Sequence, residues 1–132
     1  MREGLEERAP ENLRLLGWAD PATFWPACDL AVLTSDNEAM PYSLVEAALA
    51  GLPSVTTDAG SASEVVVDGV TGLVVPLSPR GVAEGVRSLV ADPERMAAMG
   101  AAARERALVE FSPGRMLREH TAAYEEAIAR RS

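Results

Sequence analysis

The stretch that decides the fold reads SDNEAMPYSLVEAALAGLP and runs from Ser35 to Pro53. The residues just before it, DLAVLT at 29–34, form an apolar run that predicts a buried strand. After Pro41 the apolar residues recur at helical spacing, which predicts a helix over Tyr42–Ala50, with Gly51 just beyond its end. A strand followed directly by a helix is typical of an α/β fold with a parallel sheet.

Two carboxylates flank the predicted start of this helix. Glu38 and Glu46 are eight positions apart, so one lies at the carboxyl end of the strand and the other about one turn into the helix. Open α/β sheets bind ligands at that edge. A helix N-terminus there offers free N–H groups to a phosphate, and carboxylates accept hydrogen bonds from sugar or ribose hydroxyls. The alternative is that both are solvated charges near a helix end.

The composition narrows the class of protein. The chain has 132 residues, enough for one domain, and its net charge of −8 argues against a general binder of nucleic acid or anionic membranes. The charge does not exclude one small anion held by backbone amides. A single cysteine, Cys28, allows no internal disulfide and is interpreted as a small buried residue. With neither a secretory signal nor an 18-residue apolar stretch, the sequence predicts a cytoplasmic protein.

The rest of the chain continues the alternation of strand and helix. Residues 1–11 are interpreted as a polar tail and 12–132 as an incomplete Rossmann-like domain, with C-terminal helices from about residue 78. The fold class is therefore α/β, with a partial parallel sheet of about four short strands. Three further strands are predicted at 13–16, 53–57 and 73–75, and one helical turn at 63–67.

Cap-then-proline pairs predict where the other helices begin. They are Asp20-Pro21, Ser78-Pro79, Asp92-Pro93 and Ser112-Pro113. The last three helices carry apolar stripes that we expect to pack in the core. The stripes are Val82, Val86, Leu89 and Val90; Met96, Met99, Ala103 and Ala107; and Met116, Leu117, His120, Tyr124 and Ile128.

The order of motifs between 12 and 126 resembles a known family. The pattern is Glu38-x7-Glu46-Ala-Ala-Leu-Ala-Gly51-Leu-Pro53, preceded by Asn12-Leu-Arg-Leu-Leu-Gly17-Trp and followed by Gly60-x3-Glu64-x3-Asp68-Gly69-x-Thr71-Gly72. This order is similar to the C-terminal, donor-binding half of family 4 retaining glycosyltransferases, which have the GT-B fold. The resemblance implies transfer of a glycosyl group from a nucleotide-sugar to an acceptor that the sequence does not identify.

The resemblance also implies roles for individual residues. Glu38 would contact hydroxyls of the donor sugar as the catalytic residue, and Glu46 would accept hydrogen bonds from the ribose. Backbone amides around Tyr42 and Ser43 would approach the diphosphate. The other donor-binding candidates are Met40, in the same turn, and Gly17 and Trp18, near the nucleobase. No metal and no cofactor is expected, because positive groups and the helix dipole would stabilise the departing diphosphate.

The sequence departs from the family pattern in two ways. Where the family often has Glu-Gly-Phe-Gly, this chain has Glu38-Ala-Met-Pro41, and Pro41 offers no N–H to a phosphate. The family also has two earlier strands that carry a basic pair, and a whole N-terminal domain. Without them the strand at 13–16 has no neighbour, so the chain is interpreted as a fragment, or as one that completes its sheet with a missing N-terminal region or by self-association.

The sequence therefore leaves two functions from different classes open. The first is the donor-binding segment of a glycosyltransferase, inactive in isolation. The second is a non-catalytic remnant that serves as an oligomerising or interaction module. Among other candidates, Glu64 is interpreted as capping its own short helix and His120 as a packed or rim histidine. Trp18 and Trp25 could instead lie in the core.

Overall fold

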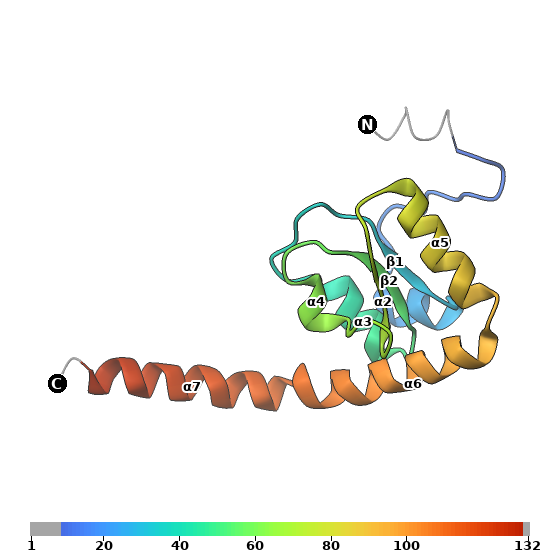
Figure 1. Cartoon of the computed structure of the whole chain (residues 1–132). Helices are drawn as coiled ribbons and strands as arrows, with labels where there is room; N and C mark the ends of the chain where they lie inside the picture. The colour runs from blue at the N-terminus through green and yellow to red at the C-terminus, as the bar shows by residue number, and fades with distance from the viewer. Residues whose placement is uncertain (1–8, 131–132) are drawn as a thin grey trace.

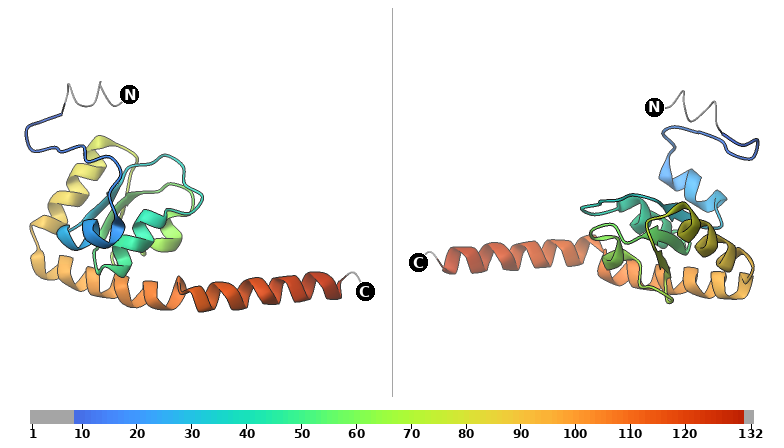
Figure 2. Two further views of the ribbon diagram at one scale, coloured as in Figure 1. Left: turned by 180° about the vertical axis from the view of Figure 1, so that it is seen from behind. Right: turned by 45° about the horizontal axis from the view of Figure 1, so that its top comes forward.

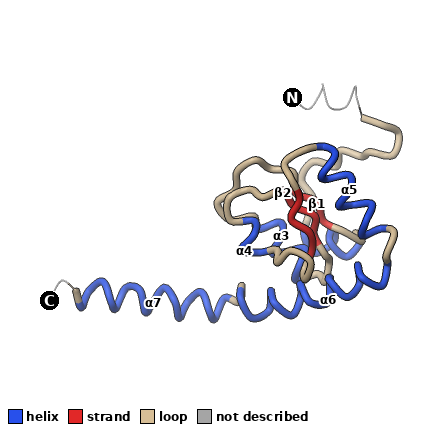
Figure 3. Tube along the Cα trace, in the orientation of Figure 1, coloured by secondary structure: helices blue, strands red, loops and turns tan. Residues whose placement is uncertain are grey.

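A computed structural model describes residues 9–130 as a three-layer α/β domain with a long terminal helix (Figures 1 and 3). The sheet has three parallel strands in the order β1-β2-β3. They are β1 (Ala31–Leu33), β2 (Ser54–Thr57) and β3 (Gly72–Val75). The central strand β2 is buried along its whole length. The α/β class is thus confirmed, with one strand fewer than predicted.

Residues 13–16 were predicted to form a strand but do not adopt strand conformation. Only one edge of β1 is paired among the described residues, and β2 occupies it. A strand needs a paired strand to satisfy its backbone groups, and residues 13–16 belong to none of the three paired strands. The predicted strand was therefore wrong.

Helices cover both faces of the sheet (Figure 1). They are α2 (Pro21–Phe24), η1 (Trp25–Ala27), α3 (Tyr42–Leu49), α4 (Ala62–Val65), α5 (Pro79–Val90), α6 (Pro93–Glu110) and α7 (Pro113–Ala129). Alternate side chains of the strands point to opposite faces. Leu33 and Val74 therefore pack against α3 and α4, whereas Val55, Leu73 and Val75 pack against α5 and α6.

Proline-containing caps start these helices as predicted. The side chains of Asp20, Ser78, Asp92 and Ser112 each accept a hydrogen bond from a backbone amide in the first turn of the helix that follows. Gly51, just after α3, has a positive φ of 82° as expected for a residue that ends a helix. A Cβ on Gly100 would lie 2.2 Å from the carbonyl oxygen of Gly51, so α3 and α6 approach closely.

The last helix contradicts the predicted core. Helix α7 projects away from the domain in every view (Figures 1 and 2). Its large apolar side chains are 60–69% exposed; they are Met116, Leu117, Tyr124 and Ile128. His120 is exposed as well, and so is Val90 of α5. A helical period shows that one face is apolar but not how much of it is covered, and most of this face stays exposed among the described residues. No helix within residues 9–130 is both long and apolar enough to span a membrane.

Candidate functional site

Glu38 lies in the loop between β1 and α3 and is half-buried. Ser35 Oγ donates a hydrogen bond of 2.6 Å to Glu38 Oε1, which orients the carboxylate. Thr57, the last residue of β2, in turn donates its hydroxyl to the carbonyl oxygen of Ser35. The carboxyl ends of two adjacent strands therefore hold the first acidic side chain in place.

The loop after β2 holds the same segment from the other side. The amide of Ser61 donates to the carbonyl oxygen of Glu38 at 3.2 Å, and the Ser61 hydroxyl donates to that of Ala39. Gly60 makes this contact possible, because a Cβ there would lie 2.1 Å from the Glu38 carbonyl oxygen. Its φ of +56° is in the left-handed region that favours glycine. The Gly60 of the sequence motif thus serves to position the Glu38 loop.

The N-terminus of α3 presents one free amide. Pro41 is the N-cap and supplies no side-chain hydrogen bond. Its carbonyl oxygen accepts from the amides of Leu44 and Val45, and the amide of Tyr42 donates to the carbonyl oxygen of Met40. Among residues 9–130, the amide of Ser43 alone in this first turn has no acceptor. Of the two predicted amides, Ser43 is therefore available to an anion and Tyr42 is already bonded.

Glu46 lies in the second turn of α3 and is half-buried. Its Oε2 accepts a hydrogen bond of 3.2 Å from Nε1 of Trp25, which belongs to η1. The other carboxylate oxygen, Oε1, has no hydrogen bond to the described residues. Glu46 and Trp25 line a shallow hollow of about 240 Å³ between α2 and α3.

The remaining donor-site candidates differ in how the fold holds them. Gly17 has a positive φ of 74° and forms the bend that precedes α2. The side chain of Trp18 is 87% exposed, so the core alternative for this residue is wrong. Trp25 is half-buried and packs against a core cluster of Ala31, Ala47 and Leu52, so the core interpretation suits Trp25.

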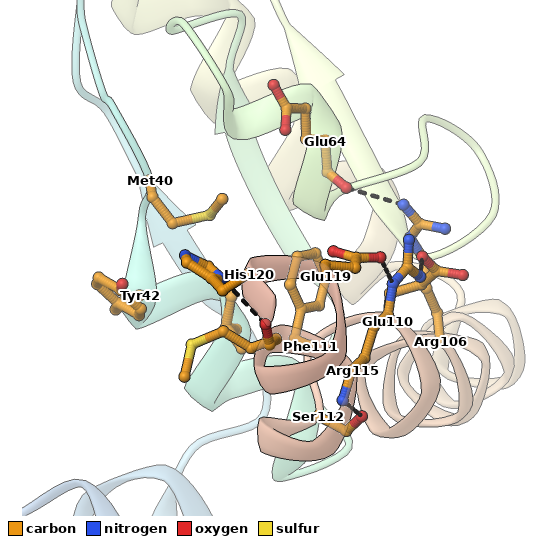
Figure 4. Close-up of a pocket in the computed structure, with 12 residues that line it drawn as sticks. Met40, Tyr42, Glu64, Arg106, Glu110, Phe111, Ser112, Arg115, Glu119 and His120 are labelled. Atoms are coloured by element: carbon orange, nitrogen blue, oxygen red, sulfur yellow. Dashed lines mark hydrogen bonds and ion pairs between the residues drawn. The ribbon is translucent and has the colours of Figure 1, made fainter. Parts of the chain in front are cut away.

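The sequence did not indicate the larger pocket at the junction of α6 and α7 (Figure 4). It has a volume of about 560 Å³, and the candidates Met40 and Tyr42 form part of its wall. Arg115 pairs there with Glu119 and Glu110, and the hydrogen bonds that its guanidinium donates to Glu119 and then to Glu110 raise the pKa of Arg115. These three residues are close in sequence, but the opposite wall comes from Met40, Tyr42 and Glu64, so no local motif brings the whole lining together.

Other lining groups in this pocket are also engaged. Arg106 Nη2 donates a hydrogen bond of 2.9 Å to the carbonyl oxygen of Glu64. His120 Nδ1 lies 2.8 Å from the carbonyl oxygen of Met116. Glu64 sits in the first turn of α4 without capping it, because α4 has no side-chain cap. The Asp68 side chain accepts a hydrogen bond of 2.9 Å from the amide of Val74. No group of three metal-ligating side chains occurs in the described part of the chain.

The sequence can now be placed among known proteins. Residues 4–106 match the family described as "Glycosyl transferases group 1". The chain belongs to this family. It is 39% identical over 84 residues to glycogen synthase from Mycobacterium tuberculosis, which covers 63% of this chain and 20% of that protein. It is 33% identical over 125 residues to D-inositol 3-phosphate glycosyltransferase from Corynebacterium kroppenstedtii, covering 94% of this chain and 26% of that protein.

Solved structures with the GT-B glycosyltransferase fold share the architecture of this group 1 chain. Sucrose-phosphate synthase from Thermosynechococcus elongatus superposes with a TM-score of 0.87 at 25% identity, over 97% of this chain and 34% of that one. Anabaena HepE in complex with UDP and glucose superposes with a TM-score of 0.84 at 27% identity, over 95% of this chain and 35% of that one. The chain thus spans about a third of these structures, and a fifth to a quarter of the curated relatives.

Proposed function

We propose that this chain is the donor-binding segment of a retaining, family 4 glycosyltransferase, and that it binds a nucleotide-diphosphate sugar. The observation that carries the proposal is the free amide of Ser43 in the first turn of α3, a residue that lies between Glu38 and Glu46 in the sequence. Membership of the group 1 family and the UDP complex of HepE support a sugar nucleotide as the ligand.

Each residue has a distinct role in this proposal. The Ser43 amide and the positive end of the α3 dipole bind the diphosphate. Glu46 Oε1 accepts a hydrogen bond from a ribose hydroxyl, and Glu38, oriented by Ser35, accepts from hydroxyls of the transferred sugar. Pro41 has no amide to contribute, so fewer donors face the diphosphate than in the usual family pattern. The charge that develops on the leaving diphosphate is stabilised by these dipoles and by basic groups outside this chain, without a metal.

Calorimetric titration of the chain with UDP-glucose and with GDP-mannose tests the proposal. We expect Glu46→Gln to weaken binding about 10- to 100-fold, because a hydrogen bond to a charged group is lost. Glu94→Gln is the matched control, since Glu94 is an exposed glutamate in the first turn of α6. If neither nucleotide-sugar binds, or if Glu46→Gln and Glu94→Gln bind equally well, the proposed donor site is wrong.

Exposed surfaces outside the α3 site favour a second function. Helix α7 exposes an apolar face, and β1 has an unpaired edge among the described residues. Both are surfaces on which another chain can pack or pair. A non-catalytic remnant that acts as an interaction module would use these surfaces and leave Glu38 and Glu46 without a ligand.

A further inference from the structure

We propose that Trp25 is a positioning residue, which holds the carboxylate of Glu46 so that one oxygen is presented to the ribose of the donor. This inference rests on the proposed function, because it assumes that Glu46 meets a ribose hydroxyl. The observation behind it is the hydrogen bond of 3.2 Å from Trp25 Nε1 to Glu46 Oε2, between residues 21 positions apart.

The indole of Trp25 is held by its surroundings, so it is a rigid donor. Its ring lies edge-on to that of Phe24, with centroids 4.9 Å apart and an angle of 69° between the planes. The carbonyl oxygen of Trp25 accepts from the amide of Cys28 at 3.0 Å, which closes η1. Trp25 also packs against the buried cluster of Ala31, Ala47 and Leu52.

A glutamate on a helix surface has several rotatable bonds, and ordering it on binding would weaken the affinity. Because Trp25 already binds Oε2, the side chain is ordered before the ligand arrives. A carboxylate can accept several hydrogen bonds, so Oε1 remains available to a hydroxyl. The alternative interpretation is a purely structural role, in which the hydrogen bond only attaches η1 to α3.

Trp25→Phe separates the two interpretations, because it keeps an aromatic ring and removes the N–H donor. The probes are UDP and 2′,3′-dideoxyuridine diphosphate, which has no ribose hydroxyls. We expect Trp25→Phe to weaken UDP binding about 3- to 10-fold and to leave binding of the dideoxy compound unchanged. Thr23→Ala is the control, because Thr23 Oγ1 donates only to the backbone oxygen of Asp20 in the same short helix.

The outcomes distinguish this inference from the function on which it rests. If the unmodified chain prefers UDP to the dideoxy compound and Trp25→Phe keeps that preference, the positioning role is wrong and the donor site stands. If the unmodified chain binds neither compound, or binds both equally, the ribose contact of Glu46 is wrong and the inference falls with it.

A second readout covers the case in which Trp25→Phe does not fold. The chain has two tryptophans, so a ¹H–¹⁵N spectrum contains two indole signals, from Trp18 and Trp25. Glu46→Gln assigns the Trp25 signal, which we expect to shift when the charged acceptor is replaced. UDP should then shift this signal in the unmodified chain and the dideoxy compound should not; equal shifts with both would overturn the inference.

Discussion

Replacing Gly60 by alanine tests whether the β2–α4 loop really holds the Glu38 segment. A Cβ at this position would lie 2.1 Å from the carbonyl oxygen of Glu38, which belongs to the backbone and cannot rotate away. Gly60 also has a φ of +56°, so alanine is strained even without a neighbour. Gly69 separates the two effects, because its φ is +73° and a Cβ added there would have nothing within 4 Å.

The contacts of each glycine set the expected loss in the free energy of unfolding. A left-handed alanine costs about 1–2 kcal/mol, and this cost applies to both variants. At Gly60 the loop must also move away, which breaks the hydrogen bond from the Ser61 amide to the Glu38 carbonyl oxygen. Losing that bond and disturbing the packing adds about 1–2 kcal/mol. We therefore expect Gly60→Ala to lower the free energy of unfolding by about 2–4 kcal/mol and Gly69→Ala by about half as much.

Urea unfolding followed by circular dichroism measures both free energies under the same conditions. Gly60→Ala should also weaken binding of a nucleotide-sugar, because Glu38 loses its support, whereas Gly69→Ala should not. If Gly60→Ala destabilises the chain no more than Gly69→Ala, the two loops are not in the contact described here, and Glu38 is not positioned by Gly60.

Three further outcomes are expected. Leu89→Ala should lower the free energy of unfolding by about 2–5 kcal/mol in urea titration, because Leu89 is fully buried between α5 and the sheet; a loss below about 1 kcal/mol would contradict that packing. Asp92→Ala should lower the free energy of unfolding by about 1 kcal/mol in the same titration, because the Arg95 amide loses its hydrogen-bond acceptor. Asp92→Asn keeps an acceptor and should lower this free energy by less. The exposed face of α7 should make the chain self-associate with rising concentration, as measured by light scattering, and Met116→Glu with Leu117→Glu should reduce it; a monomer at all concentrations would refute this expectation.

The features predicted correctly from sequence are those that neighbouring residues decide. The caps at Asp92 and Ser112 depend on a side chain and an amide three positions apart, and both form as expected. Glycine at position 51 ends α3 because the left-handed conformation is needed there. For the same local reason, the order of β1, α3 and β2 around Glu38 and Glu46 could be predicted.

The features missed depend on distant partners. The run at 13–16 has strand composition but adopts no strand conformation, and the α7 face has core composition but stays largely exposed among the described residues. The hydrogen bond from Trp25 to Glu46 and the pocket around Arg115 join parts of the chain that no motif links. Periodicity can name the apolar face of an element, but only the fold decides which surface meets it.

The amide signal of Ser43 in a ¹H–¹⁵N spectrum tests the central claim most directly, because this amide is free at the start of α3. On titration with UDP-glucose or GDP-mannose, we expect the Ser43 signal to shift strongly and saturably, together with that of Glu46. A Ser43 signal that stays in place while the nucleotide-sugar binds elsewhere, or that never moves at saturating concentration, would contradict the donor site described here.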